Sequence, residues 1–241
     1  MEHRRVARAV RLAVIGGIGS IGGMAATFIF LFARRGALRW GATNQEAGES
    51  LPGDDLIAHA NITATRAITI CATANHVWPW IAQLGQGRGG LYSYDALENI
   101  IGCDIHSAHR IVPEWQNIGV GDEVRLHPNV ALLVAALEPG RWLVIRGGVP
   151  VGDTPPPFDF TWAFVLHDQP DETIRLLVRE HYAYTQWWAP FLIEPIAAIS
   201  FVMSQKMLRG IRDRAERAAA REAILATLAM RPPDSRSRMQ S

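Results

Sequence analysis

The order of hydrophobic patterns along this 241-residue chain predicts an α+β fold. Three observations carry the prediction. Residues 61–70 alternate between apolar and polar side chains, residues 122–184 form a run of strand-like segments separated by turn signals, and residues 190–229 follow a helical period. This order favours an antiparallel sheet that curves around a long amphipathic helix and leaves a mainly apolar cavity between the two.

The elements follow in order. The first strand carries Ile62, Ala64, Ile68 and Ile70 on one side and threonines on the other. Short helices are expected at residues 74–84, where Pro79 predicts a kink, and at residues 94–101. Turn residues such as Pro139-Gly140 and Pro170-Asp171 then separate five predicted strands. These strands are residues 123–126, 131–138, 141–146, 158–167 and 173–184.

The long helical pattern has one apolar stripe, which we expect to close the concave side of the sheet. Its members, three to four residues apart, are Leu192, Ile196, Ile199, Met203, Met207 and Ile211. After Arg212 the pattern becomes polar and alanine-rich, and Pro232-Pro233 is expected to end the helix.

Residues 12–33 form a stretch of 22 residues without a charge, bracketed by arginines. As a helix it would span about 33 Å, enough to cross a bilayer core. We therefore expect a retained single-pass membrane anchor, with a cleaved signal peptide as the alternative. Positive-inside counting slightly favours a cytoplasmic N-terminus, and the Gly19 and Gly23 pair would allow a weak homodimer.

These patterns divide the chain into an anchor over residues 1–40, a polar linker over 41–60, a main domain over 61–222 and a helix end with a tail over 223–241.

The formal net charge of +1 gives no electrostatic attraction toward nucleic acid. Two cysteines and scattered histidines show no metal-ligand spacing, so no metal and no cofactor are expected. The GxGxxG match at residues 85–90 lacks the strand before it and the helix after it that a dinucleotide site needs.

Two segments carry a family resemblance. Val77-Trp78-Pro79-Trp80 runs on to Gly85, and Arg88-Gly89-Gly90-Leu91-Tyr92-Ser93-Tyr94-Asp95 follows. Together with Gly119-Val120-Gly121-Asp122, Thr173 to Arg179 and the helix around Met203, they resemble the START-like (SRPBCC) superfamily over about residues 55–215. Within it, the VWPW segment and the apolar N-terminus are similar to bacterial members with a membrane anchor. The resemblance implies a helix-grip fold around a hydrophobic ligand cavity.

The last strand carries the strongest candidate for chemistry. One face of it reads Ile174, Leu176, Val178, Glu180, Tyr182, so Glu180 and Tyr182 should line the cavity, and Arg179 and His181 should face outward. Glu180 would act as a general acid or base, or pair with an arginine such as Arg66. The full set of candidate ligand-contacting residues is Trp78, Tyr92, Tyr94, Trp162, Val178, Glu180, Tyr182, Met203 and Met207.

Asp95 and Glu98 lie three residues apart on a predicted helix and would be neighbours on one face. Helix-terminal charge and capping is the favoured interpretation, with acid–base work as the alternative.

Three functions remain open at this stage. The leading one is a membrane-anchored binding domain for a hydrophobic small molecule such as a lipid, polyketide or isoprenoid. The others are a polyketide cyclase or dehydratase that uses Glu180 and Tyr182, and a partner-binding module with a vestigial cavity.

Overall fold

The computed structural model describes residues 34–100, 102–148 and 156–230. The chain divides into two compact units, Met1–Leu38 and Arg39–Ser241. Of the first unit only residues 34–38 are described, and they are helical. The expected membrane anchor at residues 12–33 and the tail beyond residue 230 lie outside the described residues.

The second unit is α+β, as the sequence predicts. Its strands form one antiparallel sheet in the order β1-β6-β5-β4-β3-β2. They are β1 (Ile62–Ile70), β2 (Glu123–His127), β3 (Val130–Glu138), β4 (Trp142–Gly147), β5 (Phe158–Asp168) and β6 (Ile174–Tyr184). The helices are α2 (Asn44–Gly48), α3 (Ala74–Ala82), α4 (Asp95–Ile100) and α5 (Ala189–Ala229), with 3₁₀ turns η1 (Asp54–Leu56) and η2 (Pro113–Trp115).

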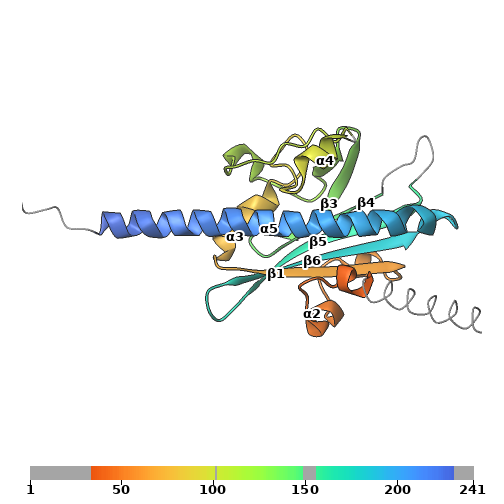
Figure 1. The fold of residues 1–241 in the computed structure, drawn as a ribbon, viewed down its shortest axis with the longest axis horizontal. Helices are drawn as coiled ribbons and strands as arrows, with labels where there is room; N and C mark the ends of the chain where they lie inside the picture. Colours follow the sequence, from red (N-terminus) through yellow and green to blue (C-terminus); the bar gives the residue numbers. More distant parts are fainter. Residues whose placement is uncertain (1–33, 101, 149–155, 231–241) are drawn as a thin grey trace, which may run out of the picture. The chain divides into compact units, whose positions relative to one another are not determined.

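The long helix α5 runs alongside the strands in Figure 1 and packs against α3 and β1. It is the one helix of the described residues that is long and apolar enough to cross a membrane by length and composition. One of its faces is nevertheless buried in the domain. Its buried members are Ala189, Ile193, Ala197, Ser204, Met207, Leu208, Gly210, Ile211 and Ala215.

The buried face of this helix differs in part from the apolar stripe that the sequence predicts. Met207 and Ile211 are buried as predicted, but the prediction is wrong for Ile196 and Ile199, which are exposed. Ala197 and Ser204 take the buried positions. Small and polar residues fit here because the sheet presents large aromatic side chains and a charged pair to this part of the helix.

The other face of the sheet is covered by residues 39–58, which were expected to be part of a linker. Thr43 and Glu46 form a capping box at the start of α2, and Leu51 and Ile57 are buried. Leu51 belongs to a core cluster with Ala67, Val144, Ala163, Val165 and Leu177.

Arg179 and His181 lie on this second face, as the period of β6 predicts, but they are buried rather than exposed to solvent. The Arg179 guanidinium donates to Asp54 Oδ2 at 2.6 Å and to the carbonyl oxygens of Glu46 and Glu49 at 2.8 Å each. Burial lowers the pKa of His181. Arg179 therefore attaches the segment 39–58 to the sheet.

Candidate functional site

Glu180 is the centre of a buried polar network between the sheet and α5. Its Oε1 accepts from Arg66 Nη1 at 2.5 Å, and Arg66 is fully buried. The hydroxyls of Ser200 and Ser204 on α5 donate to the same carboxylate at 2.9 to 3.0 Å, and Tyr182 donates to Oε2 at 3.0 Å. The ion pair with Arg66 and the inward orientation of Glu180 and Tyr182 are thus as expected.

The register of the sheet places these groups together. Glu180 lies opposite Ala64 on β1 and opposite Trp162 on β5, so Arg66, two residues along β1, is its diagonal neighbour on the same face. Burial and the adjacent Glu180 charge raise the pKa of the Tyr182 phenol well above its usual value. Tyr182 therefore stays protonated at physiological pH and acts as a hydrogen-bond donor.

A small, partly open cavity of about 80 Å³ lies beside this network. It is bounded by α4 and the loop before it, by β5 and by α5, and its walls combine apolar and hydroxyl side chains. The lining residues are Leu91, Ser93, Glu98, Trp162, Ser200, Met203, Ser204 and Met207. Three of the candidates named from the sequence, Trp162, Met203 and Met207, are among them.

Glu98 is the acidic residue in the lining of this cavity. Its side chain is the single buried one of α4 and only 6% exposed. Among the described residues neither of its carboxylate oxygens has a hydrogen-bond donor in bonding geometry. Burial, followed by the negative charge of Asp95, raises the pKa of Glu98 to about 7. The Ser93 hydroxyl opposes this rise, but it donates its hydrogen to Met203 O at 3.2 Å.

Asp95 has a different role from Glu98. Its carboxylate accepts from the backbone N–H of Ser107 at 2.7 Å and from the Ser107 hydroxyl at 2.6 Å. The two carboxylates therefore have separate roles. Asp95 holds Ser107 in place, and Glu98 lines the cavity.

Trp162 supplies the aromatic wall of the cavity. Its ring lies 4.8 Å from the ring of Phe164, and Phe160 continues the row toward Tyr182. Within the described part of the chain, Trp162 Nε1 is buried without an acceptor. Two residues of the lining, Trp162 and Glu98, therefore carry one unpartnered donor and one unpartnered carboxyl group, and buried polar groups without partners are costly unless something else satisfies them.

The remaining candidates do not line this cavity. Tyr92 is buried on the other side of its loop, where its hydroxyl donates to Trp80 O at 3.0 Å and burial raises its pKa. Tyr94 is exposed beside Lys206, whose Nζ lies 5.9 Å from the ring. Trp78 is half-buried on α3, and Val178 is buried on the face of β6 that also carries Glu180.

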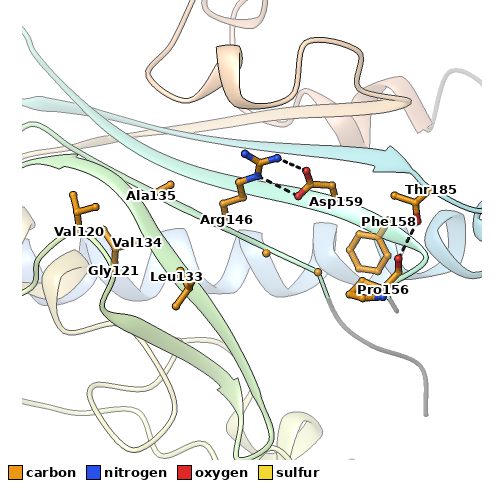
Figure 2. Close-up of a pocket in the computed structure, with 12 residues that line it drawn as sticks. Val120, Gly121, Leu133, Val134, Ala135, Arg146, Pro156, Phe158, Asp159 and Thr185 are labelled. Atoms are coloured by element: carbon orange, nitrogen blue, oxygen red, sulfur yellow. Dashed lines mark hydrogen bonds and ion pairs between the residues drawn. The ribbon is translucent and has the colours of Figure 1, made fainter. Parts of the chain in front are cut away.

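A larger hollow of about 560 Å³ lies where β3, β4 and β5 meet (Figure 2). Figure 2 shows its two charged side chains paired with each other, since Arg146 Nη2 contacts Asp159 Oδ2 at 2.6 Å. Thr185 donates to Pro156 O at 2.9 Å in the same view. Its charged groups are thus satisfied within the protein, which distinguishes it from the smaller cavity.

No group of three or more potential metal ligands occurs among the described residues. Cys71 is exposed and Cys103 half-buried, and both are free thiols.

Five lining residues were not among the ligand-contact candidates named from the sequence: Leu91, Ser93, Glu98, Ser200 and Ser204. Ser200 and Ser204 face the cavity because the phase of α5 differs from its apolar stripe. Glu98 was read as a helix-terminal charge. No local signal singles it out, because the same helix carries the apolar Leu97 and Ile100, which the structure leaves exposed.

Comparisons with known proteins give the following result. No protein-family profile and no curated protein sequence matches the chain. Among solved structures, jhp0584 from Helicobacter pylori is 10% identical and aligns over 72% of this chain and 99% of its own, with a TM-score of 0.43. CalU16 from Micromonospora echinospora is 19% identical over 66% of this chain and 86% of its own, with a TM-score of 0.31. DynU16, from the dynemicin biosynthetic locus, is 13% identical over 61% of this chain and 46% of its own, with a TM-score of 0.35. At these identities and TM-scores the likeness carries no argument about function.

Proposed function

We propose that this protein is a membrane-anchored, START-like domain that binds a hydrophobic small molecule, of the lipid, polyketide or isoprenoid class, between α4, α5 and the sheet. The observation that carries the proposal is the small cavity between α4, β5 and α5. Apolar walls from Leu91, Trp162, Met203 and Met207 surround a buried carboxyl group that lacks a hydrogen-bond partner among the described residues. Binding pockets typically combine mostly apolar walls with a few polar groups of this kind.

The polar groups indicate the chemistry of the ligand. Trp162 Nε1 can only donate a hydrogen bond, and the Glu98 carboxylate, when charged, can only accept one. A hydroxyl or phenol group satisfies both, because it donates and accepts at one oxygen atom. The ligand we expect therefore has an apolar body and a hydroxyl group at the end that faces α4.

The size of the cavity requires α4 to move. A volume of about 80 Å³ is below the range of roughly 300–1,000 Å³ for ligand pockets. Helix α4 has six residues and buries one side chain, the acid Glu98, while Leu97 and Ile100 are exposed. A helix with so little buried apolar surface is weakly held, so its displacement enlarges the cavity at low cost.

The test is native mass spectrometry of the full-length protein, which is extracted from membranes with an amphipathic polymer in place of detergent. Met203→Trp fills the cavity, whereas Val202→Trp adds the same side chain at the neighbouring exposed position. We expect a co-purified small molecule in the wild type and in Val202→Trp, and at least tenfold lower occupancy in Met203→Trp. An empty wild-type protein, or equal occupancy in both variants, would contradict the proposal and favour a partner-binding module with a vestigial cavity.

A second candidate function, a cyclase or dehydratase that uses acid–base chemistry in the same cavity, is favoured by one observation. A carboxyl group with a pKa of about 7 exists in both protonation states near neutral pH, which suits a general acid or base. Glu98 is better placed for this role than Glu180, whose oxygens are occupied by Arg66, Ser200, Ser204 and Tyr182.

Incubation of the co-purified molecule with fresh protein separates the two functions. An enzyme should change the mass or retention time of the molecule, and Glu98→Gln should slow that change by about two orders of magnitude while binding persists. A molecule that is recovered unchanged over many hours supports binding alone.

A further inference from the structure

The solvent-facing side of the first half of α5 is apolar. Phe191 is 80% exposed, Ile199 63% and Val202 47%, and Trp187 just before the helix is 84% exposed. Ile196 borders the same side at 37%. Exposed apolar residues scattered singly are normal, but here four of them lie within the first four turns of one helix and a fifth, Trp187, lies just before it. We call this set of residues the α5 patch.

The exposed side of α5 becomes charged where the α5 patch ends, and large exposed apolar residues return only at Ile224, Leu225 and Leu228 near the end of the helix. The stripe that begins at Phe191 and Val202 continues at the same helical spacing with Lys206, Arg209 and Asp213, which are charged. Lys206 Nζ lies 5.9 Å from the Tyr94 ring, and the Arg209 guanidinium lies 5.1 Å from the Trp40 ring.

This sequence of groups is typical of a helix at a membrane surface. Interfacial helices bury aromatic and aliphatic side chains below the headgroups, whereas lysine and arginine extend their charged ends to the headgroup level. Tryptophan and tyrosine favour that same level because their rings are partly apolar and partly polar.

We propose that the α5 patch docks on the surface of the lipid bilayer, with Lys206 and Arg209 at the headgroups. The inference concerns the orientation of the domain and is independent of which molecule the cavity binds.

The chain before the domain favours a bilayer over other occupants. The uncharged run of residues 12–33 is long enough to cross a membrane, and Arg34, Arg35 and Arg39 follow it. Seven residues lead from Ala33 to Trp40, whose carbonyl accepts from Ala67 N of β1 at 3.0 Å. Seven residues reach at most about 25 Å, so a bilayer that contains residues 12–33 lies within that distance of Trp40. The positive charges of these three arginines are attracted to the negative charge of anionic headgroups.

The test uses the full chain with Cys71 and Cys103 replaced by serine, reconstituted into nanodiscs of phosphatidylcholine and phosphatidylglycerol. An environment-sensitive nitrobenzoxadiazole dye is attached to Val202→Cys or to Leu225→Cys. Leu225 is the matched control, because it is 57% exposed on the same helix but lies beyond the patch. We expect nitroxide-labelled lipids to quench the dye at 202 at least threefold more strongly than at 225.

A second pair of variants tests the contribution of the patch. Phe191→Glu with Ile199→Glu should reduce the quenching at 202 to the level at 225, whereas Ile224→Glu with Leu228→Glu should leave it unchanged. All four side chains are at least 59% exposed, so these changes do not disturb the core. Equal quenching at 202 and 225 would overturn the proposal. A blue-shifted dye at 202 that lipid nitroxides do not quench would also overturn it, since a protein surface would then cover the patch.

Discussion

Two buried glutamates, Glu98 in the wall of the cavity and Glu180 in the polar network behind Ser200 and Ser204, differ in what surrounds them. Glu180 accepts hydrogen bonds from Arg66, Tyr182 and two serines of α5, whereas Glu98 has no hydrogen-bond donor in bonding geometry among the described residues. A buried charge with a full set of hydrogen-bond partners has a structural role, and removal of one partner lowers the free energy of unfolding. A buried acid without partners is available to a ligand. The difference assigns a structural role to Glu180 and a role in ligand recognition to Glu98.

The largest effect is expected from breaking the satisfied pair. Arg66→Met keeps much of the side-chain volume but leaves Glu180 as an unpaired buried charge, which should lower the free energy of unfolding by about 3–5 kcal/mol. Chemical denaturation at pH 7 measures it. The matched control is Arg125→Met, whose partner Glu123 is half-exposed, and its effect should be within about 1 kcal/mol. Equal losses in the two variants would contradict the structural role of Arg66.

A smaller effect of opposite sign is expected at Glu98. Its pKa is about 7 in the folded protein, above the ordinary glutamate value of 4.5, so the folded state retains a proton between these two pH values. Stability should therefore fall as pH rises from about 4.5 to 7 and stay low above it. Glu98→Gln mimics the protonated acid and should leave stability at pH 4.5 nearly unchanged but raise it by about 1–3 kcal/mol at pH 8. A variant that is destabilised at pH 8 would show that the folded protein needs the charge.

The smallest effect concerns Glu46, the acid with the opposite environment. A hydrogen bond from Arg175 is the main reason that its pKa is lowered to about 2. Its stabilisation should be present above pH 4.5 and disappear as pH falls toward 2. Glu46→Gln should thus cost at most about 1 kcal/mol at pH 7 and nothing near pH 2, because the pair lies near the surface. Thermal unfolding at these two pH values measures it, and a loss that grows at low pH would contradict the assignment.

The sequence predicted the strands to within one or two residues at each end, because alternation and turn residues are local signals. The same alternation predicted that Glu180 and Tyr182 face inward and that Arg66 is a possible partner. Side chains of a strand alternate between two faces, so once one residue is assigned to a face the faces of all the others follow.

Prediction failed where tertiary contacts decide. A helix that is apolar on more than one side does not reveal its buried face, so Ile196 and Ile199 were placed inward although Ala197 and Ser204 occupy those positions. Residues 41–60 read as a linker because they are polar, yet the polarity reflects partners for Arg175 and Arg179 on the far side of the sheet. Pairings this far apart in the chain leave no local signal.

The most direct test of the contrast between the two glutamates is a ¹⁵N NMR titration of the tryptophan side chains, with Trp162 assigned through Trp162→Phe. Trp162 Nε1 lies in the wall of the cavity that Glu98 also lines, whereas Trp142 Nε1 donates to Glu138 at 3.0 Å elsewhere. Between pH 5 and pH 9 the Trp162 signal should move with a midpoint of about 7, the Trp142 signal should stay fixed over the same range, and Glu98→Gln should abolish the movement at Trp162. A Trp162 signal that does not titrate, or that titrates equally in Glu98→Gln, would contradict the assignment of Glu98 as the unpaired acid of the cavity.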